Sequence, residues 1–534
     1  MSLVLNLNDF HGADDRARFA AALEAAKAQP GSTLFVPAGE YVITSELARK
    51  TRDDVISGRH GENPEDDMFN PAFDFTVGID FDGHQGTTVL GYGAKLMVDG
   101  FMEPIALQNC SGVTLKGLTI DHVRKPFSFG VIQDYVVENE KERLGYITVR
   151  FDVSTPVDAD TIMPRYCAYD YHTGRFNLDM RVITREHLGD QLVRFNMKRM
   201  PQRDLAGQEF YVWHSFHYRP GILIEEARDI TLTDVTIHSQ PGMGIVGHRS
   251  ENILMDRLRV VPSHGLHMST NTDATHFTSC KGEIKFLDCT FDGHGDDATN
   301  VHTFYHDIAP ISGDTYRGSV AVKTHSLTLD YPDVGDEMEL VDKDSLEVRR
   351  VYHIVSVEPC GKDLYYIAKL DAPLPEDAAE KCYIANVTRA PHLKFIRCTA
   401  NNHWARSVLI KTRHALVEGC TFTGAVLQAI HVAAEGSWHE GVACKDIVIR
   451  GNRFANCGIG GHAPVGGVKA EMSVDRPSGT PQEHIVIEDN IFDLPEVQYA
   501  VHVSHADDVI IRNNRFLRCG APTEIVECTN VVTD

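Results

Sequence analysis

No stretch of the chain approaches the roughly 20 consecutive apolar residues that a membrane-spanning helix needs. Residues 1–12, MSLVLNLNDFHG, also lack the basic start and the apolar core of a signal peptide. We therefore expect no membrane span. The compartment is left open: cytoplasmic if the chain begins at Met1, and secreted or periplasmic if a leader sequence has been removed.

Positive charge is also scarce. The chain has 51 Lys and Arg against 75 Asp and Glu, which gives a formal net charge of −24 at pH 7. This sign disfavours nucleic acid, anionic lipid and strongly anionic polymers as partners. We expect no nucleic-acid partner, and the simplest role of the acidity is to keep the protein in solution.

Cysteine is sparse for a chain of this size. Twelve cysteines among 534 residues are too few for a disulfide scaffold, and there is no CxxC pair or zinc-like spacing. We interpret them as small buried side chains rather than as redox or metal-binding groups.

What the sequence does have is internal repetition. Short segments such as ITLTDVTI, IKFLDCTF, ALVEGCTF and VIIRNNRF recur, and the shortest spacings between equivalent positions are 22–24 residues. That spacing is typical of one turn of a parallel β-helix, in which each turn stacks on the last and buries a continuous core. The equivalent positions are Leu118, Val235, Leu258, Cys289, Cys398, Cys420, Asn452, Asn490 and Asn514.

Two intervals are much longer than one turn, 117 residues after Leu118 and 109 after Cys289. Both contain alternating stretches such as YITVRFDV and DLYYIAKL, which predict inserted antiparallel β domains. At the N-terminus, Asp14 or Asp15 can cap a helix that covers the open end of the solenoid. The predicted divisions are 1–124 (first coils with the capping helix), 125–220 (first insertion), 221–315 (catalytic coils), 316–390 (second insertion) and 391–534 (last coils).

Three aspartates mark the middle of the repeat. DATHFTS overlays on DATNVHT, so Asp273 lies where Asp297 lies one turn later, with Asp296 beside it. Parallel strands are about 4.8 Å apart, so the three carboxyl groups should be crowded together. Two like charges about 5 Å apart repel by roughly 3 kcal/mol at an effective dielectric near 20. A glycosidase uses such crowding, because it raises one carboxyl pKa while the partners stay ionised.

The strands that follow these turns present polar side chains on one face. Alternation along each strand places apolar residues inward and the others outward. Two tryptophans and several ionisable residues lie beside this face, and aromatic rings pack well on sugar rings, although ordinary burial would explain them equally well. The predicted substrate-binding residues are His276, Asn300, His302, Trp404, Arg406, Lys411, His431, Glu435 and Trp438.

We assign Asp296 as the general acid and Asp273 with Asp297 as the pair that activates water, which predicts inversion. An acid-to-base separation of roughly 6.5–9.5 Å would agree, and about 5 Å would favour retention. Two alternatives remain: the aspartates close a turn, or they bind calcium. A calcium site would require more carboxylate or backbone carbonyl ligands than these motifs by themselves provide.

The NTD and GDD motifs around these aspartates resemble the polygalacturonase clan of inverting β-helix glycoside hydrolases. IKT at 410–412 resembles the end of the clan's RIK motif, but Leu409 stands in place of the arginine while Lys411 remains. The clan's GHG segment follows the aspartates, whereas GHG in this chain stands directly before Asp296 and Asp297, at 293–295. These departures count against a galacturonate substrate.

A closer resemblance, over nearly the whole chain, is to glycoside hydrolase family 110, the α-1,3-galactosidases. It implies an all-β fold, a right-handed parallel β-helix with an N-terminal capping helix and two inserted antiparallel β-barrel-like domains. It also implies that Asp273, Asp296 and Asp297 are catalytic in an inverting exo-enzyme. Such an enzyme releases terminal α-1,3-linked galactose from blood-group-B-like or linear glycans, with no metal or other cofactor.

Two other functions stay open. One is a polygalacturonase-like hydrolase or lyase of acidic polysaccharide, and the other is a non-catalytic carbohydrate-binding β-helix. A lyase would need a basic residue to remove the proton, and this face is rich in carboxylates. A homodimer is also left open.

Overall fold

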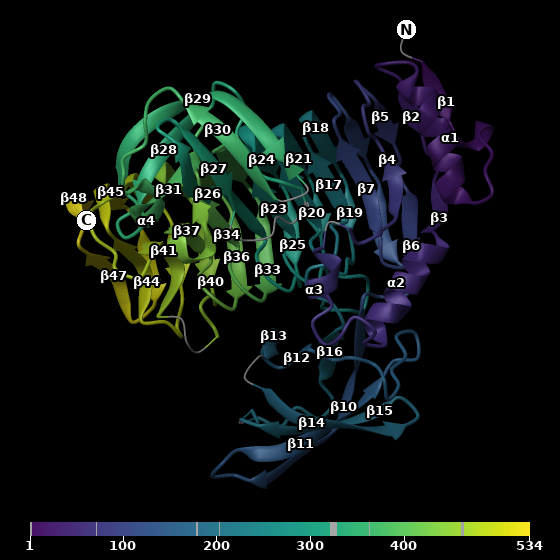
Figure 1. The fold of residues 1–534 in the computed structure, drawn as a ribbon. Helices are drawn as coiled ribbons and strands as arrows, with labels where there is room; N and C mark the ends of the chain where they lie inside the picture. Colours follow the sequence, from purple (N-terminus) through teal and green to yellow (C-terminus); the bar gives the residue numbers. More distant parts are fainter. Residues whose placement is uncertain are drawn as a thin grey trace.

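The computed structural model describes residues 3–70, 72–177, 180–201, 203–320, 328–361, 364–460 and 464–534. In these residues the chain winds into three long sheets of parallel strands stacked along one axis (Figure 1). Most turns contribute one strand to each sheet. This arrangement confirms the predicted all-β fold, a parallel β-helix interrupted by two antiparallel insertions.

Each of the three sheets is built from strands that pair in chain order. The first contains β1 (Val4–Asn6), β2 (Thr33–Phe35), β5 (Thr88–Leu90), β8 (Thr114–Lys116), β18 (Arg228–Thr233), β21 (Glu251–Asp256), β24 (Lys281–Leu287), β32 (His392–Ile396), β35 (Arg413–Glu418), β39 (Lys445–Arg450), β42 (Gln482–Glu488), β45 (Ala506–Arg512) and β48 (Thr529–Thr533). The second contains β3 (Gly39–Thr44), β6 (Ala94–Asp99), β9 (Thr119–His122), β19 (Thr236–Ile237), β22 (Arg259–Val260), β25 (Thr290–Asp292), β33 (Thr399–His403), β36 (Thr421–Ala425), β40 (Arg453–Ala455), β43 (Ile491–Asp493) and β46 (Arg515–Arg518). The third, which carries the site, contains β4 (Val77–Asp80), β7 (Glu103–Gln108), β17 (Ile222–Glu225), β20 (Ile245–His248), β23 (Thr275–Thr278), β26 (Thr299–Ser312), β34 (Val408–Lys411), β37 (Ile430–Glu435), β41 (Val465–Ser473), β44 (Tyr499–Ser504) and β47 (Ala521–Val526).

One continuous apolar core fills the solenoid from Leu7 to Ile511. Phenylalanines on successive turns stack face to face within it, as Phe454 does on Phe492 with ring centroids 4.7 Å apart. At the turn between two sheets, amide side chains bond in sequence: Asn452 Oδ1 accepts from the Cys420 backbone at 2.8 Å, and Asn490 Oδ1 accepts from the Asn452 backbone at 2.9 Å. The amide side chains thus form a ladder along this turn, and the cysteines at the equivalent positions of earlier turns, Cys289, Cys398 and Cys420, are buried.

The N-terminal helix α1 (Asp15–Lys27) lies at the end of the solenoid (Figure 1). Asp14 caps it by accepting a hydrogen bond from the Ala17 N–H at 2.8 Å. Its buried residues, Phe19, Ala22, Leu23 and Ala26, pack on the first coils. Two further helices, α2 (Glu46–Ile56) and the short α3 (Glu65–Met68), follow before β4.

The first insertion is a seven-stranded antiparallel sheet with its own apolar core. Its strands are β10 (Phe127–Asn139), β11 (Leu144–Phe151), β12 (Arg165–Asp170), β13 (Arg175–Asn177), β14 (Arg181–Gly189), β15 (Leu192–Lys198) and β16 (Glu209–Trp213). Figure 1 shows it standing away from the solenoid on one side.

The second insertion is a closed antiparallel barrel that continues directly from β26. That strand pairs in parallel with β34 in its first half and antiparallel with barrel strands in its second half. The remaining barrel strands are β27 (Thr315–Ser319), β28 (Glu337–Asp342), β29 (Val348–Cys360), β30 (Tyr365–Leu370) and β31 (Cys382–Asn386), and α4 (Ala378–Lys381) precedes β31. A strand that begins in the catalytic coils thus continues into the barrel. The division into five numbered segments remains a proposal.

Candidate active site

The three aspartates lie on two neighbouring turns, directly before strands β23 and β26 of the third sheet. The Asp297 carbonyl accepts a hydrogen bond from Ala274 N, and the Asp297 N–H donates to Asp273 Oδ1 at 3.2 Å. One carboxyl oxygen from each of Asp273, Asp296 and Asp297 lies within 4.8 Å of the others. Gly295 permits this close stacking, because a Cβ there would lie 2.2 Å from the Asn271 carbonyl oxygen.

Arg406, at the same place on the next turn, binds Asp297 through both of its carboxyl oxygens. Its Nε donates to Oδ1 at 2.9 Å, its Nη2 donates to Oδ2 at 2.9 Å, and its backbone N–H adds a bond of 2.8 Å to Oδ1. A paired guanidinium favours the ionised form of a carboxylate. Asp297 is therefore the carboxyl group of the trio that is paired with a fixed positive charge.

The pKa values of the other two carboxyl groups are raised. Burial and the neighbouring charges of Asp297 and Asp273 raise the pKa of Asp296 well above its ordinary value. Burial and Asp297 likewise raise the pKa of Asp273 well above its ordinary value. Asp296 thus has a property required of a general acid, a pKa raised well above that of an ordinary carboxyl group.

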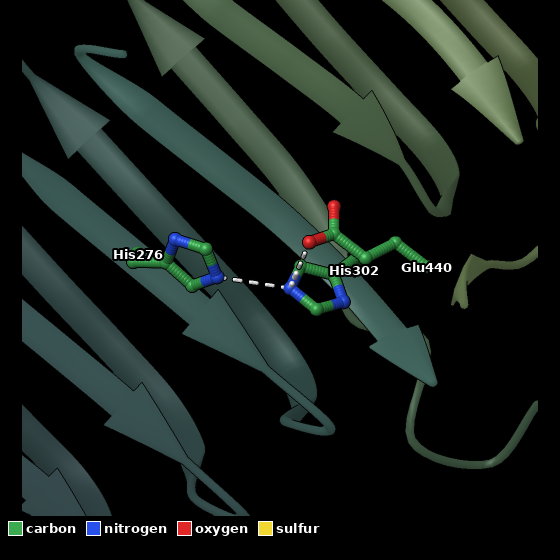
Figure 2. A group of neighbouring side chains, drawn as sticks. All are labelled: His276, His302 and Glu440. Carbon is green, nitrogen blue, oxygen red and sulfur yellow. Dashed lines mark hydrogen bonds and ion pairs between the residues drawn. The ribbon is translucent and has the colours of Figure 1, made fainter. Parts of the chain in front are cut away.

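A second group of polar side chains adjoins the trio (Figure 2). His276 Nδ1 lies 2.6 Å from Asp273 Oδ2, and His276 Nε2 lies 2.9 Å from His302 Nε2. Glu440, on the short strand β38 (Glu440–Gly441), lies 3.8 Å from His302 Nε2. Burial lowers the pKa of both histidines to about 4.

Lys411 is buried between two carboxylates, those of Glu435 and Glu440. Burial alone would lower the pKa of Lys411, but Glu440 and Glu435 raise it above its ordinary value. The lysine therefore carries a charge that two anions of the chain already balance.

These residues line a cavity of about 550 Å³. Its floor is the third sheet, one wall comes from the segment around α3, and another comes from residues 435–440. The indole of Trp438 stands at this cavity with 63% of its surface exposed. The lining residues are Glu65, Asp66, Phe69, His217, Met243, Asp273, His276, Asp296, Asp297, Asn300, His302, Phe304, Arg406, Leu409, Lys411, Glu435, Trp438 and Glu440.

Ten of the twelve residues proposed from the sequence are among those lining residues. Trp404 is not: its ring packs edge-on against Trp213 of the first insertion, with centroids 4.6 Å apart. His431 is not either, because it is buried with Nε2 at 3.1 Å from Glu471 Oε1. Sequence reasoning missed Glu65 and Glu440, which reach the cavity from parts of the chain outside the aligned strands.

Two clusters in the described residues have enough close ligand atoms to be considered for a metal. They are Asp273 with Asp296 and Asp297, and His276 with His302 and Glu440. In each cluster a cation of the chain is already bonded to a carboxylate, Arg406 in the first and Lys411 in the second. We therefore interpret both as networks of ion pairs and hydrogen bonds.

No family model matches the chain. Among curated proteins, it is 28% identical to alpha-1,3-galactosidase A of Bacteroides fragilis over 523 residues, which cover 93% of this chain and 84% of the relative. Alpha-1,3-galactosidase A of Shewanella woodyi is 24% identical (82% and 72% covered), and alpha-1,3-galactosidase B of Bacteroides thetaiotaomicron is 23% identical (89% and 78%).

The chain is similar to alpha-1,3-galactosidases over most of its length. This confirms the resemblance inferred from the sequence, and these relatives indicate a glycoside hydrolase. In the described residues, no helix has the length and apolar character needed to cross a membrane.

Solved structures of other β-helix proteins are similar as well. The A-module of the mannuronan C-5 epimerase AlgE4 of Azotobacter vinelandii has a TM-score of 0.46 at 12% identity, covering 99% of this chain and all of that one. An exopolygalacturonase from Thermotoga maritima has a TM-score of 0.41 at 10% identity, covering 99% of this chain and 91% of that one.

Proposed function

We propose that the chain is an exo-acting glycoside hydrolase that releases terminal α-1,3-linked galactose from blood-group-B-like or linear galactosyl glycans. The observation that carries the proposal is the asymmetry within the aspartate trio. Arg406 binds both carboxyl oxygens of Asp297, while burial and the charges of Asp297 and Asp273 raise the pKa of Asp296 well above its ordinary value. An acid and a carboxylate held side by side are what glycoside hydrolysis requires. The names of the similar proteins support galactose as the sugar.

In this mechanism Asp296 donates its proton to the glycosidic oxygen as the bond to the anomeric carbon breaks. Asp273 and Asp297 hold the attacking water on the opposite side of the sugar ring. Both oxygens of Asp297 are bonded to Arg406, and Asp273 is bonded to His276 and to the Asp297 N–H. Carboxyl groups fixed in this way suit the orientation of a water better than attack on the sugar, so we propose inversion.

The separation of the carboxyl groups, by contrast, favours retention over inversion. Oxygens within 4.8 Å of each other are closer than the 6.5–9.5 Å expected for a simple inverting pair and nearer to the retaining distance of about 5 Å. The stereochemical proposal therefore rests on the hydrogen bonding around Asp273 and Asp297, and only the anomer of the first product decides it.

A neutral sugar fits this cavity better than an acidic one. Its two cationic side chains are already paired, Arg406 with Asp297 and Lys411 with Glu435 and Glu440. A uronate carboxylate would have to displace one of those carboxylates, and the net charge of −24 would oppose its approach. An endo-acting enzyme on acidic polysaccharide is disfavoured for the same reasons.

The test is the release of free galactose from an α-1,3-galactosyl disaccharide, followed by ¹H NMR from the first minutes of the reaction. We expect the β-anomer first, and polygalacturonate should not be cleaved. Asp296→Asn should lose activity by several orders of magnitude, while Asp288→Asn, whose side chain pairs with Arg397 on the exposed surface, should not. The α-anomer first would overturn inversion but leave the galactosidase proposal standing. No release of galactose would overturn the proposed function.

A further inference from the structure

An unbroken series of close contacts runs from Asp273 through His276 and His302 toward Glu440, and we call these four residues the relay. Figure 2 shows His276 pointing at His302, which in turn faces the Glu440 carboxylate. The first two contacts, Asp273 to His276 and His276 to His302, are 2.6 and 2.9 Å long. At such distances each contact must contain a proton, because two bare acceptors would repel one another.

One end of the relay fixes where these protons are. His302 Nδ1 lies 2.9 Å from the Thr303 carbonyl oxygen, which can only accept. His302 therefore carries its proton on Nδ1, and its Nε2 is an acceptor when the ring is neutral. The proton in the contact between the two rings then belongs to His276 Nε2.

This assignment decides the state of Asp273. A neutral His276 that is protonated on Nε2 has a bare Nδ1, and this atom faces Asp273 Oδ2. Burial lowers the pKa of His276 to about 4, which favours the neutral ring, and with a neutral His276 the proton of this contact is on Asp273, which donates to the imidazole. The raised pKa of Asp273 and the lowered pKa values of both histidines agree with this arrangement of hydrogen bonds.

A protonated Asp273 cannot take a proton from water unless it passes its own proton on. We propose that the relay carries the proton of the attacking water through Asp273 to His302, where Glu440 stabilises the resulting imidazolium. This inference rests on the proposed function, in which a water attacks the sugar beside Asp273.

The transfers balance without movement of heavy atoms. The water loses a proton to Asp273 Oδ1, the proton on Asp273 Oδ2 moves to His276 Nδ1, and the proton on His276 Nε2 moves to His302 Nε2. Asp273 and His276 end neutral and His302 ends as an imidazolium. Asp296, which gives its proton to the leaving oxygen, ends as a carboxylate, so the net charge of the site does not change. The reverse transfers then restore the enzyme: the proton on His302 Nε2 returns to His276 Nε2, the proton on His276 Nδ1 returns to Asp273 Oδ2, and the proton on Asp273 Oδ1 passes to Asp296.

The surrounding charges suit this direction of transfer. The oxygen of Glu440 that does not bind Lys411 lies 3.8 Å from His302 Nε2, so an imidazolium there gains an anionic neighbour. His217, Asp297 and Lys411 also act on His276. A water that has bonded to the anomeric carbon is strongly acidic, so a buried imidazole with a pKa of about 4 can still accept its proton.

The kinetic test compares two conservative variants that both touch Lys411. Glu440→Gln removes the anion beside His302, whereas Glu435→Gln removes the other partner of Lys411 and leaves the relay intact. For Glu440→Gln we expect kcat to fall at least tenfold with KM within about twofold. We also expect the acid limb of the pH profile of kcat/KM to move to lower pH, because loss of the anion lowers the pKa of His302. Glu435→Gln should leave that limb in place and act mainly through KM.

A proton inventory separates proton transfer from positioning. In mixtures of H₂O and D₂O, kcat of the wild-type enzyme should depend on deuterium content along a curve, since several protons move together. In His302→Gln it should depend linearly. A wild-type kcat in Glu440→Gln, or a curved inventory that persists in His302→Gln, would overturn the relay. Circular dichroism checks that both variants fold. If His302→Gln does not fold, the kinetics of Glu440→Gln alone test the relay.

A readout that does not need activity keeps this inference apart from the proposed function. In ¹⁵N NMR of histidine-labelled protein near pH 7, His302 should be the Nδ1–H tautomer and His276 the Nε2–H tautomer. Comparison with the spectra of His302→Gln and Glu440→Gln assigns the signals of His302 and His276. The reverse tautomers would sink the relay even in an active galactosidase. If the tautomers are as expected but the protein releases no galactose, only the proposed function is overturned.

Discussion

Arg406 holds Asp297 through both carboxyl oxygens from the next turn of the solenoid, so one ionised acid of the trio is fixed by the repeat itself. A lysine cannot reproduce this fork, because its ammonium group binds as a point charge. We predict that Arg406→Lys lowers kcat/KM for the α-1,3-galactosyl disaccharide by about 100-fold, corresponding to roughly 2.7 kcal/mol of transition-state stabilisation.

A surface pair of the same geometry provides the control. Arg397 forks Asp288 through Nε and Nη2 on the exposed side of the solenoid. Arg397→Lys should leave kcat/KM within about twofold and change the free energy of unfolding by less than about 1 kcal/mol. Equal losses of kcat/KM in the two variants would show that Arg406 only supports the fold.

The alkaline limb of activity should follow Asp296. A general acid must be protonated, and burial with the charges of Asp297 and Asp273 raises the pKa of this group. We therefore predict that kcat/KM persists at pH values well above the ordinary carboxyl range and is lost only as pH rises through the raised pKa. The pH profile of kcat/KM measures this, and a loss of activity within the ordinary carboxyl range would exclude Asp296 as the acid.

Asp273→Asn tests the protonated state of the neighbouring carboxyl group. The variant removes the proton relay and should abolish turnover. The free energy of unfolding should change by less than about 1 kcal/mol, since an amide can still donate to His276. Urea unfolding beside the galactose assay provides the measurement, and a variant that unfolds would contradict the protonated state of Asp273.

The repeat explains why so much of this site could be predicted from the sequence. Asp273 and Asp297 fall at equivalent positions of neighbouring turns. Because the strands pair in parallel register, residues at equivalent positions in the repeat lie next to each other in space. The same register places His276 beside Asn300, and Asn300 beside Leu409. The periodicity of the sequence was therefore enough to predict both the fold and the residues on the floor of the cavity.

The walls of the cavity could not be predicted in this way. Glu440 comes from a short return strand that pairs antiparallel with Phe304, and Glu65 comes from the chain before the first insertion. Neither belongs to the repeat, so no alignment of turns brings them to the site. Trp404 shows the converse case, because its position just before Arg406 gave no sign that its ring would pack against Trp213 of the first insertion.

The two tryptophans beside the site should respond differently to removal. Trp438 is 63% exposed at the cavity, so Trp438→Ala should raise KM about tenfold and leave the melting temperature unchanged. Trp404 is partly buried against Trp213 and Phe176, so Trp404→Ala should lower the free energy of unfolding by about 2–3 kcal/mol. Steady-state kinetics and urea unfolding of both variants provide the measurement. An increase in KM for Trp404→Ala without loss of stability would return that residue to the binding site.

A buried carboxylate outside the site should govern the pH dependence of stability. Asp330, in the second insertion, lies between His248 at 3.0 Å and His306 at 2.9 Å, and its side chain is 2% exposed. Burial would raise the pKa of Asp330, but its bonds to His248 and His306 lower it well below the ordinary value. This contribution to stability is present above the unfolded pKa of about 3.9 and is lost as pH falls toward the lower folded value.

His248 acts in the opposite direction. Burial lowers its pKa, but Asp330 and Glu225 outweigh burial and raise the pKa above 6.5. Its contribution is therefore complete below pH 6.5 and is lost as pH rises through the folded value. We predict that Asp330→Asn lowers the free energy of unfolding by about 3–5 kcal/mol, because the variant removes the buried anion that His248 and His306 share. Urea unfolding at about pH 5, 7 and 9 measures this, and the difference between wild type and variant should shrink at the highest pH. A difference that stays constant with pH would mean that the His248–Asp330 contact is an uncharged hydrogen bond.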